Sequence, residues 1–387
     1  MSTKIAVLFE SLFWHPAAGW PTATRAYARA MEMADLDVSL TSPIPWIGDP
    51  DPDVFAEVGH LAKRPAKWDI YIFSSPFTSP TVMERPLKIL IRGAKPPRVM
   101  YTMIERRSIA PESAQLVSQL DGVWLPCRAN VEAFNRSGVP TNKTGYMPFP
   151  FFNDDPNAAI FGTNRAPGVP RFLWDGNWEP RKAPDNLVRA FMRAFKPGEA
   201  RLTMKIGLLP LPAAGFPMGP EVVVVDEIQQ NSGVAAKGWT SNNYSDSIRI
   251  VRGQLREMEM VKLRADHDIY VSCSRGEGID LPVFKAKLAG RRVVATYSGG
   301  PEEFLGTKDV RVAATGVAPV HSMYQLESGA EYGDYSVDDL AAALAKAAEG
   351  PLVSKERDWP IENFRARAVG IKLRRLVEKT IDDTRRR

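Results

Sequence analysis

The 387-residue sequence contains little cysteine: only Cys127 and Cys273 are present. Each lies in an apolar, strand-like run, so we expect both thiols to be buried and reduced rather than joined in a disulfide. So few cysteines exclude the disulfide-rich scaffolds of small secreted domains. This usage is typical of a reducing compartment, and we expect a cytoplasmic protein.

Long apolar segments are also missing. No run approaches the roughly 20 apolar residues of a membrane-spanning helix, and the N-terminus leads into a short strand-like segment without an apolar stretch of signal-peptide length. We therefore expect no transmembrane segment and no secretion signal. The apolar fraction of 44% and the charged fraction of 25% are ordinary for a soluble globular protein. The net charge of +5 permits an anionic acceptor or surface without requiring one.

Several catalytic and metal-binding signatures are absent as well. The sequence has no Walker P-loop, no GxGxxG after a strand and no Ser-His-Asp signature. Its four histidines lack metal-ligand spacing. The alternating Asp49, Asp51 and Asp53 lie in a proline-rich stretch, which favours a solvated turn over a metal site. We expect no bound metal.

The sequence does contain an alternation of strand-like and helix-like segments along its length. Strands are predicted at residues 4–9, 69–73, 98–103, 122–125, 171–174, 201–207, 222–225, 248–251, 268–274 and 292–296. Such alternation predicts an α/β protein with doubly wound parallel sheets. The length favours two domains. We expect them at residues 1–155 and 171–355, with a polar linker at 156–170 and an amphipathic helix at 356–387.

Residues 275–290 form the most informative segment, which lies between the strands predicted at 268–274 and 292–296. It reads RGEGIDLPVFKAKLAG, with Pro282 suited to a first helical turn and Gly290 to a helix stop. Glu277 thus follows the carboxyl end of a buried strand, where open parallel sheets bind ligands. A helix N-terminus at this point suits a phosphate group.

This segment resembles the donor-binding segment of family 4 of the retaining glycosyltransferases, which have the GT-B fold. The family reads E-G-F-G-L-P, then a second Glu, Ala-Gly and a Val-Val strand. The positions in step are Glu277, Gly278, Leu281, Pro282, Val283, Ala286, Ala289, Gly290, Val293 and Val294. Two positions depart: Asp280 replaces a glycine, and Lys285 replaces the second Glu, which usually holds the ribose of the donor.

Other segments extend the resemblance over most of the chain. GNWEPRKAPDNLVRAF resembles a family segment in which Lys182 is kept, while Asn177 replaces an arginine and Ala183 a glycine. IRIVRGQLREMEM, with Gly253, resembles the run that lines the base pocket, and SGGPEEF resembles the Gly-Gly-x-x-Glu segment. The resemblance implies two Rossmann-like domains that face each other across a cleft. The N-terminal domain would bind the acceptor and the C-terminal domain the donor, and the last helix would cross back to the N-terminal domain.

The resemblance also implies roles in donor binding. Arg181, Lys182 and the backbone N–H groups near Ile279 would stabilise the leaving diphosphate, although the two cations could instead be a solvated helix start. Glu277 would bind a sugar hydroxyl, or else cap the following helix. Lys285 could contact a phosphate, pair with Asp280 or Glu277, or be an exposed helix lysine. The expected donor-binding residues are Gly19, Trp20, Arg181, Lys182, Gly253, Glu277, Gly278, Ile279, Asp280, Leu281, Pro282 and Lys285.

Candidate acceptor residues lie in the N-terminal half. His15 shares the glycine-bearing loop with Gly19, and Glu105 follows the strand predicted at 98–103. Glu105 could act as a general base or be a surface acid paired with an arginine such as Arg106. The catalytic residues expected are Glu277, Lys182 and Glu105, and the acceptor-binding residues His15, Glu105 and Arg106.

We therefore expect a retaining, metal-independent glycosyltransferase that uses a UDP- or GDP-sugar as co-substrate and no cofactor. The acceptor stays open among a small molecule, a glycan, a lipid headgroup and a hydroxylated base in DNA, which the basic balance tolerates. A different class also stays open, a non-catalytic protein that binds a sugar nucleotide or a partner. Asn177, Asp280 and Lys285 motivate that alternative.

Overall fold

The computed structural model describes residues 4–14, 19–43, 51–63, 65–74, 96–162, 168–207, 247–252, 255–319, 331–349 and 358–386, and the structural statements below concern these residues. The chain divides into two compact units. Unit 1 is built mainly from Met1–Asn153 and Pro360–Arg387, and unit 2 from Asp154–Met323 and Glu331–Trp359. The short helix α6 (Pro156–Ala159) lies in the segment expected to be a linker and belongs to unit 2.

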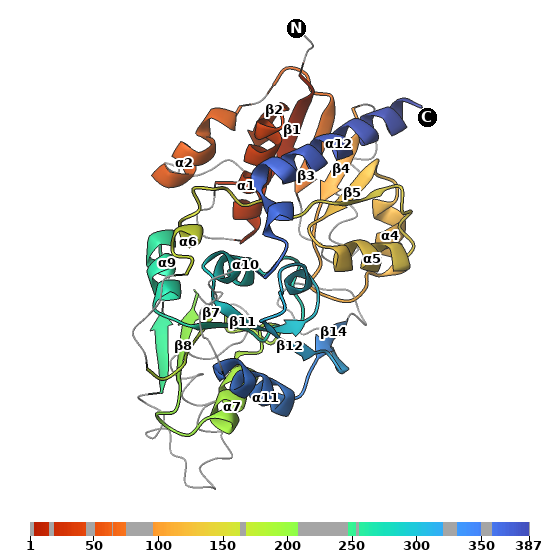
Figure 1. Ribbon diagram of the computed structural model, residues 1–387. Coiled ribbons are helices and arrows are strands. Elements are labelled where there is room, and N and C mark those ends of the chain that lie inside the picture. Colours follow the sequence, from red (N-terminus) through yellow and green to blue (C-terminus); the bar gives the residue numbers. More distant parts are fainter. Residues whose placement is uncertain are drawn as a thin grey trace. The chain divides into compact units, whose positions relative to one another are not determined.

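Unit 1 contains a parallel sheet in the order β2-β1-β3-β4-β5-β6 (Figure 1). Its strands are β1 (Ala6–Glu10), β2 (Asp37–Thr41), β3 (Ile70–Ser74), β4 (Arg98–Tyr101), β5 (Gly122–Leu125) and β6 (Thr144–Tyr146). Their central residues are buried, as expected when both faces of a parallel sheet are covered. The strand order reverses between β1 and β3, because β2 pairs on the other side of β1.

The helices of unit 1 are α1 (Gly19–Met33), α2 (Pro52–Val58), α4 (Pro111–Val117), α5 (Arg128–Arg136) and α12 (Ala366–Arg385). Helix α12 packs directly on α1: a Cβ at Gly370 would lie 2.1 Å from the carbonyl oxygen of Ala30. Asp51 caps α2 by accepting hydrogen bonds from the backbone of Asp53 and Val54. In the described part of the chain, no helix is both long and apolar enough to cross a membrane.

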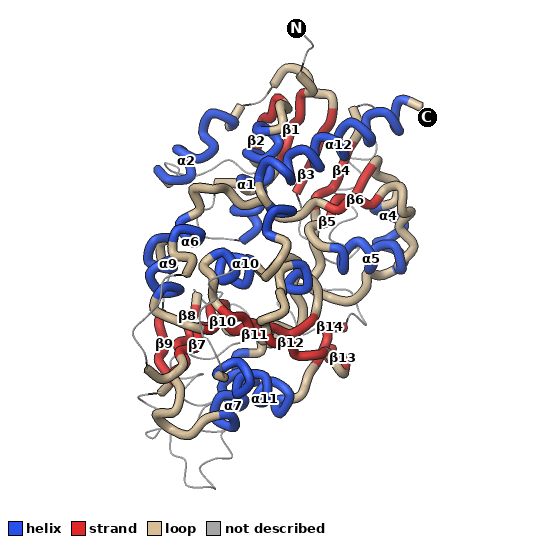
Figure 2. Tube along the Cα trace, viewed as in Figure 1, coloured by secondary structure: helices blue, strands red, loops and turns tan. Residues whose placement is uncertain are grey.

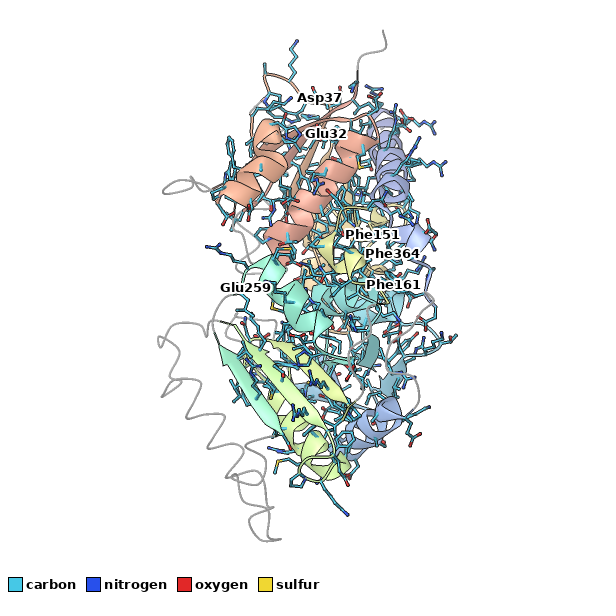
Figure 3. The ribbon with its side chains drawn as sticks, turned by 60° about the vertical axis from the view of Figure 1, so that its left-hand side comes forward. Glu32, Asp37, Phe151, Phe161, Glu259 and Phe364 are labelled. Atoms are coloured by element: carbon cyan, nitrogen blue, oxygen red, sulfur yellow. The ribbon has the colours of Figure 1, made fainter. Side chains whose placement is uncertain are left out.

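Two distant segments of unit 1 are joined where the chain leaves and re-enters the unit. The Phe151 N–H donates to the carbonyl of Phe364 at 2.8 Å, and the Ala366 N–H donates to the carbonyl of Phe151 at 2.8 Å. Figure 3 shows Phe151 and Phe364 close together. The returning chain is thereby fixed by backbone hydrogen bonds before α12 begins.

Unit 2 contains a second parallel sheet, in the order β9-β8-β7-β10-β11-β12 (Figure 2). Its strands are β7 (Arg171–Gly176), β8 (Arg201–Ile206), β9 (Ile248–Arg252), β10 (Ile269–Ser272), β11 (Arg292–Tyr297) and β12 (Val310–Ala313). The order reverses between β7 and β10, as in a Rossmann sheet, where this reversal marks the usual ligand position. The strand expected at 222–225 lies outside the described residues.

The helices of unit 2 are α6, α7 (Pro184–Ala194), α9 (Glu257–Ala265), α10 (Leu281–Leu288) and α11 (Val337–Ala348). Helices α7 and α11 pack on one face of the sheet, where Phe172, Phe191 and Leu340 belong to one buried core. An antiparallel ribbon is formed by β13 (Gly316–Pro319) and β14 (Glu331–Asp334). The expected α/β architecture with two parallel sheets is confirmed.

Candidate active site

A group of buried and half-buried charged side chains lies at the carboxyl edge of the unit 2 sheet. One loop, after β7, brings Glu179, Arg181 and Lys182, and another, after β10, brings Glu277 and Asp280. We call these five residues the charged cluster. Because β7 and β10 are adjacent parallel strands at the reversal of strand order, their following loops must meet there.

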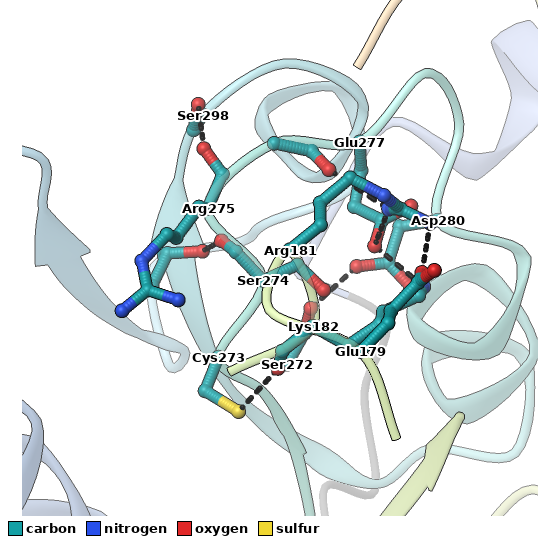
Figure 4. Close-up of polar contacts among 12 residues, drawn as sticks. Glu179, Arg181, Lys182, Ser272, Cys273, Ser274, Arg275, Glu277, Asp280 and Ser298 are labelled. Carbon is teal, nitrogen blue, oxygen red and sulfur yellow. Dashed lines mark hydrogen bonds and ion pairs between the residues drawn. The ribbon is translucent and has the colours of Figure 1, made fainter. Parts of the chain in front are cut away.

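Glu277 is the centre of the charged cluster (Figure 4). Its Oε1 accepts hydrogen bonds from Lys182 Nζ at 2.5 Å and from Arg181 Nη1 at 2.9 Å. Arg181 also donates to the carbonyl of Gly276 at 3.0 Å and to Glu179 at 2.7 Å. Glu277 is 6% exposed, so its charge is held by these cations rather than by water. The two cations are therefore not a solvated helix start.

The ionisation of these groups follows from their pairing. Burial alone would raise the pKa of Glu277, but the charges of Lys182 and Arg181 outweigh burial and lower it to about 2. Burial opposes the charge on Lys182, yet the Glu277 carboxylate keeps the pKa of Lys182 above its usual value. Both partners are charged at neutral pH, and an anionic ligand would find two cations already at the edge of the sheet.

Two glycines hold the backbone on which Glu277 stands. The N–H of Gly300 donates to the Glu277 carbonyl at 2.8 Å. Gly299 has φ +86°, and a Cβ there would lie 2.2 Å from the same carbonyl oxygen. A Cβ at Gly300 would lie 2.4 Å from the carbonyl oxygen of Ile279. The SGGPEEF segment thus requires glycine because its backbone packs directly against the loop that carries Glu277.

Asp280 occupies a left-handed backbone position, with φ +64°. This conformation explains why a glycine suits the position, and aspartate is one of the few other residues that tolerate it. The Asp280 side chain caps α10 by accepting from the Val283 N–H at 3.4 Å, and it accepts from Ser272 Oγ at 2.5 Å. The capping role considered for Glu277 therefore belongs to Asp280.

Asp280 differs from Glu277 in its protonation. Burial raises the pKa of Asp280, and the nearby negative charge of Glu277 raises it further, to about 7.

The four residues from Gly276 to Ile279 are buried like Asp280, while Leu281 and Pro282 open α10 and are half-buried. The expected donor-binding residues of this loop are thus brought to one place.

Ala183 also stands in a left-handed conformation, with φ +47°, directly before α7. It is fully buried and its position follows Lys182, so the loop turns sharply after the cation. The thiol of Cys273 donates to the carbonyl of Lys182 at 3.1 Å, which ties this turn to β10. Burial raises the pKa of Cys273 to about 12, so this thiol is a packed, unreactive group.

Lys285 does not pair with Asp280 or Glu277, which was one of the alternatives left open for it. Lys285 Nζ contacts Glu257 Oε2 at 2.6 Å, and Glu257 also approaches the buried Arg264 at 3.5 Å. Lys285 lies more than one turn into α10, so its side chain reaches the N-terminal end of α9 instead of the loop that holds Glu277. Lys285 is therefore neither an exposed helix lysine nor part of the charged cluster.

The candidates in unit 1 lie on its own sheet edge. Gly19 and Trp20 begin α1, and the Trp20 ring packs on Tyr101 at the end of β4, with 5.4 Å between centroids. Strand β4 ends at Tyr101, two residues before the predicted end at residue 103. After the strand, Ile104 is held by the side-chain amide of Asn130, which accepts from the Ile104 N–H and donates to the Ile104 carbonyl, both at 3.0 Å. Glu105 is half-buried.

Arg106 of unit 1 is buried, with 7% of its surface exposed. His15 and Gly253, together with Asp49, lie outside the described residues. Among the described residues no group of three or more His, Cys, Asp or Glu side chains is arranged to hold a metal.

Sequence reasoning missed Glu179, Ser272 and Glu257. Glu179 lies two residues from Arg181, a spacing that could have suggested the pair. Ser272 and Glu257 have no such signal, because their partners Asp280 and Lys285 are eight and 28 residues away. Only the fold places them together.

Comparison with solved structures assigns the fold. HepE from Anabaena in complex with UDP and glucose matches with a TM-score of 0.61 at 13% identity, over 97% of this chain and 99% of that chain. Sucrose-phosphate synthase from Thermosynechococcus elongatus matches with a TM-score of 0.63 at 15% identity, over 98% and 100%. The galactosyltransferase WaaB in its apo form matches with a TM-score of 0.59 at 12% identity, over 99% and 100%.

These structures are GT-B glycosyltransferases, and the chain described here has the GT-B fold with two Rossmann-like units. The fold expected from the resemblance is therefore confirmed. No protein-family model matches the chain, and no curated protein matches it in sequence.

Proposed function

We propose that this protein is a glycosyltransferase whose second unit binds a nucleotide sugar at the charged cluster. The observation that carries the proposal is the pair of cations, Arg181 and Lys182, held by buried Glu277 at the strand-order reversal of the unit 2 sheet. This position is the usual ligand site of such sheets. HepE, which has the same fold, is a complex with UDP and glucose, which favours UDP over GDP in the donor.

The chemistry follows from the charges. As the bond between the sugar anomeric carbon and the diphosphate breaks, the diphosphate oxygen takes the electron pair and gains negative charge. Lys182 and Arg181 would stabilise that charge in a buried setting, where electrostatic effects are strongest. The acceptor oxygen forms the new bond to the anomeric carbon and loses its proton to the departing diphosphate. Glu277 would hold a sugar hydroxyl while the two cations turn toward the phosphates.

The proposal includes retention of the anomeric configuration, no requirement for a metal, and unit 1 as the acceptor-binding unit through Glu105. A DNA acceptor receives little support from the described residues. Arg106 is buried, and two basic residues of α12 already pair with acids: Arg374 with Glu378 at 2.9 Å and Lys379 with Asp383 at 2.6 Å. A small molecule, a glycan or a lipid headgroup is the better supported acceptor class.

The test is transfer and hydrolysis of a panel of nucleotide sugars by wild type, Lys182→Ala and a control, Lys196→Ala, which removes an exposed lysine of the same unit. We expect Lys182→Ala to lower the turnover rate by on the order of 100-fold or more, and Lys196→Ala to have no effect. A chelator should leave the rate unchanged, and the product should keep the anomeric configuration of the donor.

Two results would contradict the proposal. If no nucleotide sugar binds, or if Lys182→Ala turns over at the wild-type rate, the charged cluster is not the catalytic donor site. Binding without hydrolysis or transfer of any donor would instead support a non-catalytic sugar-nucleotide-binding protein.

A further inference from the structure

The charged cluster contains more acid than its cations can neutralise. Arg181 contacts both Glu179 and Glu277, and Lys182 contacts Glu277. Among the described residues no cation lies within ion-pair distance of Asp280, whose side chain contacts only Ser272 Oγ and the Val283 N–H. Three carboxyl groups thus share two cations, and Asp280 is the one without a cationic partner.

The surroundings of Asp280 oppose its ionisation. The residue is 5% exposed, so water does little to stabilise its charge. Glu277, on the same loop, is ionised, and its negative charge disfavours a second negative charge on Asp280. The positive charge of Lys182 favours ionisation of Asp280, but Lys182 is hydrogen-bonded to Glu277. From β10, Ser272 donates a hydrogen bond and Tyr270 contributes a buried phenol, beyond which lie Asp175 and Arg264. Burial and the Glu277 charge together raise the pKa of Asp280 to about 7.

A diphosphate bound at this site would change that balance in one direction. It would bring further negative charge to Lys182 and to the N-terminus of α10, which Asp280 caps. It would also draw Lys182 away from the acids and exclude water. Each change makes an ionised Asp280 less favourable, and a protonated Asp280 could donate a hydrogen bond where an ionised carboxylate can only repel.

We propose that Asp280 is a proton-binding residue of the donor site, so that binding of a nucleoside diphosphate sugar is coupled to uptake of one proton by its carboxylate. This inference rests on the proposed function. By linkage, donor affinity falls as the pH rises above neutrality, because the empty site must then acquire a proton to bind. Asp280 determines how donor affinity depends on pH, whereas Lys182 and Arg181 determine how strong donor binding is.

The test is calorimetric titration with UDP-glucose at pH 6, 7, 8 and 9, each in two buffers of different ionisation enthalpy. UDP-glucose is chosen because each of its phosphates carries one ester and one anhydride bond and has no ionisation near neutral pH, whereas a terminal phosphate would itself titrate at about pH 6. For wild type we expect proton uptake that approaches one per bound donor at pH 9, and a dissociation constant that rises up to about tenfold per pH unit above 7. Asp280→Asn keeps the cap and tolerates the left-handed conformation, and should show neither effect.

Two further variants serve as controls for the role of the Asp280 side chain. Asp280→Gly removes the side chain without backbone strain and should also bind independently of pH. Asp338→Asn removes an exposed acid of α11 and should keep the wild-type profile. The inference is overturned if wild type and Asp280→Asn bind UDP-glucose with the same proton uptake and pH profile, a result that leaves the proposed function intact. No binding by either protein at any pH overturns the proposed function, and this inference with it.

Discussion

The two sheets of this chain share one topological feature, a reversal of strand order, but carry different side chains at that position. Each is parallel and reverses its strand order once, between β1 and β3 in unit 1 and between β7 and β10 in unit 2. At the unit 1 reversal, Glu10 is bound by a neutral partner, the Tyr71 hydroxyl, at 2.7 Å, and Ser11 pairs with Thr24 at 2.8 Å. At the unit 2 reversal, Glu277 is bound by two cations.

In both units the topology supplies a location, and the side chains at that location supply the chemistry. The unit 1 edge presents the Glu10 carboxylate beside hydroxyl groups, which suit a hydroxyl-bearing ligand. A buried edge with paired cations suits a phosphate. The division of labour proposed for the two units follows from this contrast.

The sharpest test of the contrast compares the two glutamates. Glu277→Gln removes a buried charge and leaves Lys182 without its acid and Arg181 with Glu179 alone, so the free energy of unfolding of unit 2 should fall by about 3 kcal/mol. Glu10→Gln changes a hydrogen bond to a neutral hydroxyl and should cost at most about 1 kcal/mol. Chemical denaturation at pH 7 measures both. Equal losses would show that the two sheet edges are electrostatically alike.

The pH dependence of the Glu277 contribution has a definite sign. Because the pKa of Glu277 in the folded protein is lowered to about 2, its stabilisation is present above the unfolded value near 4.5 and is lost as the pH falls toward 2. Wild type should therefore lose more stability than Glu277→Gln on acidification between these values.

A second test concerns the glycine that supports the unit 2 edge. Gly299→Ala combines a positive φ with a Cβ 2.2 Å from the Glu277 carbonyl oxygen, whereas Gly198→Ala has φ +85° and an added Cβ there meets nothing within 4 Å. The shared conformational strain is about 1 kcal/mol. We expect Gly299→Ala to cost about 2 kcal/mol more and to weaken donor binding. If the two variants lose equal stability, the close approach does not matter.

A third test separates the neighbouring acids Glu277 and Asp280. The pKa of Asp280 is raised to about 7, so its contribution to stability is fully present below the unfolded value near 3.8 and is lost as the pH rises to 7. Asp280→Asn should therefore gain on the order of 4 kcal/mol over wild type on going from pH 4 to pH 8, because about three pH units separate pH 4 from the pKa of Asp280 in the folded protein. Glu277→Gln should show a smaller gain, because it removes only the part of the rise in the Asp280 pKa that the Glu277 charge contributes. Urea titrations at both pH values provide the measurement.

The smallest effect is expected at Ala183. Ala183→Gly relieves a left-handed strain of about 1 kcal/mol but loses the burial of one methyl group, worth about 0.8 kcal/mol, so the melting temperature should change little. Ala183→Val adds a branched side chain in the same conformation and should be clearly destabilising. A large stabilisation by glycine would mean that the turn after Lys182 is more strained than its backbone angle indicates.

Much of the candidate site could be predicted because its parts are local in sequence. Glu277, Asp280, Leu281 and Pro282 lie within one loop and helix start, and their order alone specifies strand, loop and helix. The sequence left open whether Glu277 caps α10, because two acids precede that helix, and only the backbone angle at Asp280 shows that Asp280 is the cap. The sequence also could not identify the partner of Lys285, because Glu257 lies on helix α9, which only the fold brings next to α10.

The alternation of elements, the two parallel sheets and the loop that carries Glu277 follow from the sequence, because strand and helix periodicity and turn residues act over a few neighbouring positions. Which charges meet depends on the folded chain. Arg181 and Lys182 lie 96 and 95 residues from Glu277, and they contact it because β7 and β10 pair across the reversal of the sheet. That pairing keeps Glu277 ionised, while burial and the Glu277 charge raise the pKa of its neighbour Asp280 to about 7.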